Sequence, residues 1–197
     1  MRILHASTYA VQPWKNGGGM TTEIIAQPPG ASFDAIDWRI SMARVERAGP
    51  FSMFAGIDRS LGVLEGEGML LAVDGRGEIA LKPGMHPLTF PGDVPVEARL
   101  IDGPILDLGV MTRRGRWRHY LSRVDVSGVF DLTRRGDVTI AVVRSASGTA
   151  DGQRFVDGQR FVDGDTIVID ETSRATAARL DFSAPCNLWI ADFWRVS

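Results

Sequence analysis

Several residues that would define a site or a compartment are scarce in this 197-residue sequence. Cysteine occurs once, at Cys186, which excludes a disulfide framework and a metal cluster held by several thiolates. The longest apolar runs, such as MLLAV at 69–73, are far too short to span a bilayer. The N-terminal MRILHASTYAVQPW also lacks the apolar core of a secretory signal. We therefore expect a soluble, cytoplasmic protein.

An excess of one charge is also missing. The chain has 22 basic and 24 acidic residues, a formal net charge of -2, which gives no reason to expect a nucleic-acid or membrane partner. Lysine occurs only at Lys15 and Lys82, so the basic residues are nearly all arginine, which suits planar, bidentate recognition of carboxylates. Arginines cluster at 113–118 around Trp117, and the acidic overall balance favours a solvated connector there over a nucleic-acid patch.

Known catalytic and metal-binding patterns are absent too. His5, His86 and His119 stand apart, with no H-x-H pair and no carboxylate at ligand spacing, so we predict no metal and no cofactor. We expect His86 and His119 at the surface. No G-x-S-x-G elbow occurs, and the apolar surroundings of Cys186 predict a buried core position. The stretch NGGGMTTE lacks the lysine of a phosphate-binding loop.

Turn signals, in contrast, are abundant. Gly- and Pro-rich turns recur along the first half, separated by short runs rich in Val, Ile, Leu, Phe and Trp, which predicts an all-β antiparallel sandwich or barrel. The clearest strand is 36–45, where an apolar face alternates with a mostly polar face that carries Arg39 and Ser41. The best helical segment, 118–124, has only a weak pattern.

Pattern echoes predict two similar β halves. LTFPGDVPVEA at 88–98 and RFVDGDTIVID at 160–170 both indicate a strand, a Gly-Asp turn and a second strand. We predict halves at 1–110 and 125–197, joined by a connector at 111–124. The hexapeptide DGQRFV occurs at 151–156 and again at 157–162, which is most simply a duplication within a hairpin loop.

One polar set in the first half remains as a candidate site. Its members are Trp14, Asn16, Thr22, Glu23, Arg39, Ser41, Ser52 and Arg59. If the polar face of strand 36–45 lines the interior, Arg39 must be paired, either with a protein carboxylate such as Glu23 or with an anionic ligand. Both interpretations stay open, because a paired arginine can exchange its partner for a ligand.

These residues also carry a resemblance. WKNGGGMTTEI, DWRISMARV, GPFSMFAGIDRSLGVLEGEG and LDLGVMTRRG, in this order over residues 14–115, resemble the HutD/Ves family. The resemblance implies a bicupin (RmlC-like) fold, with two antiparallel β-barrel or sandwich halves related by pseudo-symmetry and a ligand pocket in the first. It also implies a metal-independent protein that binds an anionic histidine-catabolism metabolite (formylglutamate, formiminoglutamate or urocanate type) and tunes histidine utilisation.

Carried over residue by residue, the resemblance predicts a specific ligand-binding set. It consists of Trp14, Asn16, Glu23, Arg39, Ser41, Ser52, Arg59 and Arg113. One position departs from the family pattern, because Gly109 stands where an asparagine is usual, so any ligand contact from that amide is absent.

Two rival functions remain. One is a cofactor-independent isomerase or hydrolase with Glu23 as general base. The other is a stress-related or purely structural protein with no link to histidine. The expected partner is a small anionic metabolite, with neither nucleic acid nor membrane, and a homodimer is left open.

Overall fold

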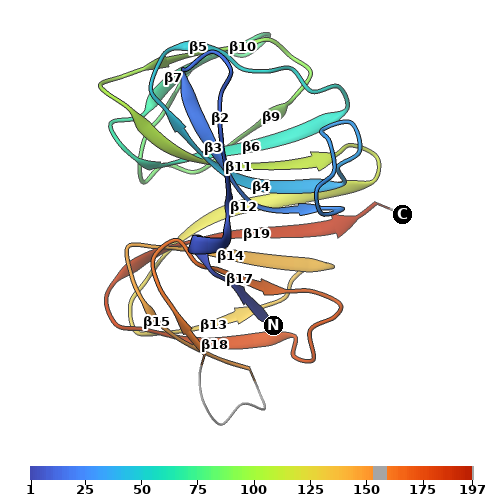
Figure 1. The fold of residues 1–197 in the computed structure, drawn as a ribbon, viewed down its shortest axis with the longest axis vertical. Helices are drawn as coiled ribbons and strands as arrows, with labels where there is room; N and C mark the ends of the chain where they lie inside the picture. The colour runs from blue at the N-terminus through green and yellow to red at the C-terminus, as the bar shows by residue number, and fades with distance from the viewer. Residues whose placement is uncertain (153–158, 197) are drawn as a thin grey trace. The chain divides into compact units, whose positions relative to one another are not determined.

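The computed structural model describes residues 1–152 and 159–196, which form two compact units (Figure 1). The N-terminal unit comprises Ala10–Arg118 with Val196, and the C-terminal unit comprises Met1–Tyr9 and His119–Arg195. The first nine residues therefore belong with the second half of the chain.

The segment predicted as a connector, 111–124, is strand at both ends. It contains the end of β11 (Ile105–Arg113) and most of β12 (Trp117–Val126). The helix considered at 118–124 is thus wrong. Trp117 and Leu121 are buried whereas Arg118 and Tyr120 are exposed, which is the two-residue period of a strand.

Two antiparallel sheets build the N-terminal unit. The six-stranded sheet has the order β2 (Ala10–Pro13), β3 (Gly19–Gln27), β4 (Trp38–Val45), β11, β6 (Ile57–Glu65), β9 (Leu88–Pro91). The four-stranded sheet has the order β5 (Gly49–Pro50), β10 (Val96–Leu100), β7 (Met69–Val73), β8 (Gly77–Leu81). Apolar side chains of both sheets, such as Leu61 and Val63 from β6 and Leu71 from β7, share one core. We call the core-facing side of the six-stranded sheet its inner face.

The C-terminal unit also has two sheets. Its five-stranded sheet has the order β1 (Arg2–Leu4), β17 (Thr166–Ile169), β14 (Val138–Arg144), β19 (Cys186–Arg195), β12. Its four-stranded sheet has the order β13 (Val129–Thr133), β18 (Ala177–Phe182), β15 (Gly148–Gly152), β16 (Gln159–Phe161). A 3-10 helix, η1, spans Ala6–Thr8. Along the described ranges, no helix has the length and apolar character that crossing a membrane requires.

The all-β prediction is confirmed, and so are several of its parts. The strand expected at 36–45 is β4, and Cys186 is buried. Both Gly-Asp segments form turns between strands, at 92–93 between β9 and β10 and at 164–165 between β16 and β17. Strands β15 and β16 pair antiparallel, but most of the DGQRFV duplication between them lies outside the described residues, so its hairpin loop stays a prediction.

The glycine run at 17–19 brings two backbone segments together. Gly17 has a left-handed φ of 66°, which glycine adopts without strain. A Cβ at Gly19 would lie 2.2 Å from the carbonyl oxygen of Arg44 and 3.2 Å from the ring of Trp14. The run is therefore required for the entry into β3 and its pairing with β4.

Gly19→Ala is expected to lower the free energy of unfolding by about 1–3 kcal/mol, because the added methyl overpacks this contact. Gly49→Ala is the matched control, since nothing lies within 4 Å of its Cβ position. Urea unfolding of both variants measures the difference. Equal stability of Gly19→Ala and the wild type would contradict the close approach.

Candidate functional site

Four charged side chains gather on the inner face of the six-stranded sheet. They are Glu23 on β3, Arg39 on β4, Arg59 on β6 and Asp107 on β11. The register places Glu23 opposite Ser41, and Met111 opposite both Arg39 and Arg59. Side chains alternate between the two faces of a strand, so these positions share one face. The polar face predicted from the sequence thus faces inward.

Arg39 is compensated by a protein carboxylate. Its Nε donates to Glu23 Oε2 at 2.7 Å, and a terminal nitrogen donates to Ser41 Oγ at 3.0 Å. The Phe33 ring lies 5.1 Å from the guanidinium carbon. The Arg39 side chain is 10% exposed and that of Glu23 34%, so the ion pair lies where the inner face meets solvent. An internal Arg–Glu bridge, one of the two predicted interpretations, is therefore present.

Arg59 lacks such compensation. Its guanidinium carbon lies 4.9 Å, 5.6 Å and 5.4 Å from the ring centroids of Phe51, Phe54 and Phe90. Its one hydrogen bond donates to the Ser52 carbonyl at 3.4 Å, and no described carboxylate oxygen lies within 4.0 Å. Burial lowers the pKa of Arg59 to about 10, so the side chain remains a cation at neutral pH. A guanidinium has five N–H donors. Aromatic faces stabilise its positive charge, but they do not replace the hydrogen-bond acceptors that these donors need.

Asp107 is the charged residue that sequence reasoning missed. It is 4% exposed, and burial raises its pKa to about 7, although the charge of Arg59 and a backbone N–H of Ala43 act in the opposite direction. In the sequence, Asp107 is a single acid inside the apolar run ILDLGV, which is part of the family motif. Asp107 and Gly109 are two residues apart on β11, so both lie on the inner face.

We call Gly109 the open position of this face, because a methyl group there would meet only ordinary van der Waals contacts. An added Cβ would have no neighbour closer than the Ser41 carbonyl oxygen at 3.8 Å, with Leu61 and Ser41 Oγ at 3.9 Å. Gly109 is partly exposed, whereas Leu108 and Val110, which point to the opposite face, are 1% and 0% exposed. Solvent therefore reaches the middle of β11 from the inner face.

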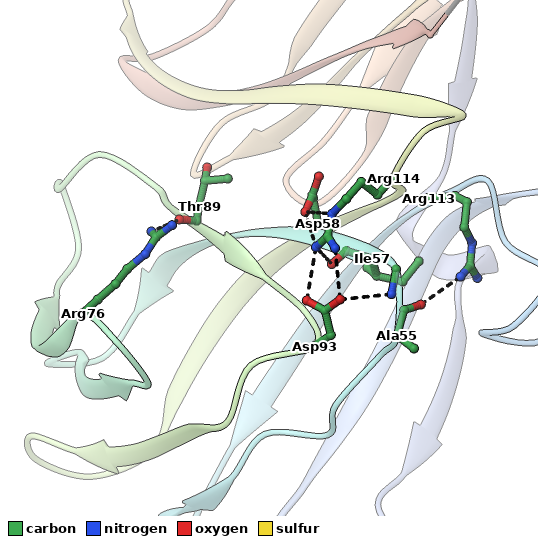
Figure 2. Close-up of polar contacts among 9 residues, drawn as sticks. Ala55, Ile57, Asp58, Arg76, Thr89, Asp93, Arg113 and Arg114 are labelled. Atoms are coloured by element: carbon green, nitrogen blue, oxygen red, sulfur yellow. Dashed lines mark hydrogen bonds and ion pairs between the residues drawn. The ribbon is translucent and has the colours of Figure 1, made fainter.

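Arg113 bonds to the backbone, and its contact with a ligand stays a prediction. Its guanidinium donates to three backbone carbonyls, those of Ile36 at 3.3 Å, Ala55 at 3.0 Å and Phe33 at 2.6 Å. The contact with Ala55 is drawn in Figure 2. These carbonyls belong to the two loops that carry Phe33 and Phe54, whose rings pack at 4.5 Å. Arg113 thus fixes the aromatic residues beside the two inner-face arginines.

The other arginines of the 113–118 segment are engaged as well. Arg114 binds the carboxylates of Asp58 and Asp93 at 2.8–3.2 Å (Figure 2), and this contact lowers the pKa of Asp93. Arg116 lies 2.9 Å from Asp37. These arginines are exposed to solvent and also hold strand ends and loops together, and the role of the segment as a connector stays a prediction.

The remaining predicted residues lie at the edge of the cluster. Trp14 Nε1 donates to Thr21 Oγ1 at 2.8 Å, and Thr21 lies two residues before Glu23 on β3. The exposed Asn16 accepts the Gly18 N–H at 3.0 Å, which closes its own turn. Ser52 contributes its carbonyl to Arg59. The structure thus brings together Glu23, Arg39, Ser41 and Arg59, and whether any of them binds a ligand stays a prediction.

The histidines lie apart from this cluster. His5 Nδ1 is 3.1 Å from Asp165, His86 is exposed, and His119 is half-buried with its ring 6.2 Å from that of Phe193. The expectation of a surface position is wrong for His119, since strand β12 turns it inward. Over the described ranges, no three His, Cys, Asp or Glu side chains form a group suited to a metal ion.

Comparison with known proteins decides the family. The sequence model of HutD matches residues 6–189. The chain belongs to the HutD family. Protein Ves of Cronobacter sakazakii is 34% identical over 141 residues, which cover 71% of this chain and 76% of that protein. An uncharacterized 21.2 kDa protein in the hutC 3' region of Pseudomonas putida is 39% identical over 125 residues, which cover 64% of this chain and 65% of that protein.

Solved structures agree in fold. A conserved protein of unknown function from Pseudomonas aeruginosa PAO1 has a TM-score of 0.87 at 30% identity, covering 98% of this chain and 97% of that chain. HutD from Pseudomonas fluorescens SBW25 has a TM-score of 0.79 at 29% identity, with 100% and 99% covered. An oxalate decarboxylase of Lactobacillus farciminis, at 9% identity, has a TM-score of 0.64 over 96% and 85% of the chains. That last likeness shows a cupin-like fold alone.

Asp107 should make stability pH-dependent. Because its pKa is about 7 in the folded protein against an ordinary 3.8, the folded state holds the proton over a pH range where the unfolded chain has released it. Stability should therefore fall as pH rises from about 4 to about 7, by at most about 1.4 kcal/mol per pH unit, and then level off. Asp107→Asn should lack this component. Urea unfolding of both proteins at pH 5, 6 and 8 measures it, and parallel pH profiles would contradict it.

Proposed function

We propose that this member of the HutD family is a metal-independent binding protein for a small anionic metabolite, held on the inner face of the N-terminal unit. The observation that carries the proposal is Arg59, a partly buried cation with three aromatic neighbours and one long hydrogen bond. Its unused N–H donors suit a carboxylate, which accepts two of them side by side.

The energetic argument favours an anion at this point. Removing a guanidinium from water is costly unless an opposite charge or good hydrogen bonds compensate it. A ligand carboxylate at Arg59 would contribute roughly 1.5–3 kcal/mol through charge-assisted hydrogen bonds. The exposed fraction of Gly109 and of the Glu23 side chain supports access from solvent.

The relatives suggest the metabolic setting. One is named for its position near hutC, and one solved structure is named HutD. We infer that the ligand is of the formylglutamate, formiminoglutamate or urocanate type, each of which carries a carboxylate, and that its binding tunes histidine utilisation.

We also infer a pseudo-symmetric bicupin architecture. Each unit has a large and a four-stranded antiparallel sheet. Each unit contains a strand, a Gly-Asp turn and a second strand. The aspartate of each turn accepts a backbone N–H: Asp93 accepts that of Gly56, and Asp165 accepts that of Ala6. These shared features support two copies of one ancestral unit.

Arg59→Ala is expected to weaken binding of the best metabolite at least tenfold, because it removes the uncompensated cation, and Arg39→Ala should weaken it less. Calorimetric titration with formylglutamate, formiminoglutamate, urocanate and glutarate measures the affinities. Arg99→Ala is the matched control, since Arg99 forms an exposed ion pair with Glu78 in the same unit and such pairs contribute little. Absence of binding across the panel would refute the proposal.

A cofactor-independent enzyme is the second candidate, and Asp107 favours it. A carboxyl with a pKa of about 7 suits a general base at neutral pH, whereas Glu23, the base considered from the sequence, is already bound to Arg39. If an enzyme, the protein should convert a member of the same panel, and Asp107→Asn should abolish turnover while binding persists. Product formation followed by NMR decides this, and an unchanged panel after prolonged incubation would rule out the candidate.

A further inference from the structure

We propose that Asp107 and the open position at Gly109 select the ligand class, so that the site takes a carboxylate that also carries an N–H or O–H donor. The carboxylate would bind Arg59, the donor would bind Asp107, and the body of the ligand would occupy the space beside Gly109. This inference rests on the proposed function and specifies its ligand.

Asp107 is placed to receive a donor. It is almost fully buried, and no described basic nitrogen lies within 4.0 Å of its carboxylate. A buried carboxylate without a close cation is costly, so a ligand donor at this point would be stabilising. The same negative charge would repel a carboxylate placed at this point, so a dicarboxylate without a donor gains nothing from Asp107.

Few other groups near Asp107 could accept a hydrogen bond from the ligand's donor. Its cross-strand neighbours Ala43 on β4 and Val63 on β6 are apolar. The facing four-stranded sheet contributes apolar side chains to the same core, such as Met69, Leu71 and Val96. The charged groups of the inner face are Arg59, whose charge acts on Asp107, together with Arg39 and Glu23, which are bound to each other.

Gly109 supplies the space between the charges. It lies two residues from Asp107 along β11 and two from Met111, which is paired with both arginines. Nothing lies closer than 3.8 Å to its Cβ position, and its φ is not in the left-handed region, so neither packing nor backbone geometry requires a glycine here. A small ligand is a sufficient reason for leaving the position open, and a longer side chain there would compete with it.

The experiment compares two probes, N-formylglutamate and glutarate, which share two carboxylates and differ in the formamido group that supplies the N–H donor. At pH 8, where Asp107 is ionised, the wild type should bind N-formylglutamate at least about tenfold more tightly than glutarate, the value of one hydrogen bond to a charged group. Asp107→Leu should reduce this ratio to about one, while its affinity for glutarate stays equal or rises. Lowering the pH to 5.5 should also reduce the ratio in the wild type.

A second variant keeps the proposal testable if Asp107→Leu does not fold. Gly109→Ala should weaken N-formylglutamate binding by about tenfold without lowering the Tm, because its methyl group would meet neighbours only at ordinary van der Waals distances of 3.8–3.9 Å and would take space from the ligand. Equal affinity for both probes would overturn the selection by Asp107 but leave anion binding intact. Full affinity in Gly109→Ala would overturn the role of the open position, and no binding of either probe would overturn the proposed function as well.

Discussion

A guanidinium inside an apolar sandwich must be compensated, and this constraint organises the N-terminal unit. Arg39 meets it with Glu23 and Ser41, which the register of β3 and β4 places beside it. Arg59 has three aromatic rings, one 3.4 Å bond to the Ser52 carbonyl and a distant acid. Phe90 lies on β9, whereas Phe51 and Phe54 come from the loop after β5. That loop is tied to the strand ends by Arg113 and by the bonds among Asp93, Arg114 and Gly56 (Figure 2). The state of one partly buried cation therefore depends on contacts made at the surface of the same unit.

Arginine performs two separate tasks here, and burial distinguishes them. At 113 and 114 the side chains are fully used by the protein, in bonds to backbone carbonyls and exposed carboxylates. On the inner face the Arg59 donors are left largely unused. Since the surrounding rings are already in place, a ligand would not have to order them, and preorganisation of this kind favours binding. The scarcity of lysine fits both tasks, because each uses the planar, multidentate guanidinium.

The sequence was sufficient for the fold class and for part of the site. The alternation in β4 indicated a polar face with Arg39 and Ser41, and elementary electrostatics then required a partner, which is Glu23. The Gly-Asp turns could also be predicted, because a turn depends on a few residues that are neighbours in the sequence. Asp107 was missed because only the register shows that one acid in an apolar run lies on the same face as Arg59. The backbone partners of Arg113 could not be predicted from the sequence, because they lie up to 80 residues away along the chain. The strand character of 118–124 was masked by its many charged residues.

The two inner-face arginines are therefore not equivalent, and this bears on the role of Glu23. A ligand carboxylate at Arg39 would have to replace the 2.7 Å bond to Glu23, which is already charge-assisted, so the exchange gains little. At Arg59 nothing has to be replaced except a 3.4 Å bond to a carbonyl. The first carboxylate should accordingly choose Arg59, with Glu23 remaining on Arg39 and keeping that charge neutral. Under the proposed function, Glu23 would limit the site to one strongly held anionic group, and the rest of the ligand would lie beside Ser41, Gly109 and Asp107.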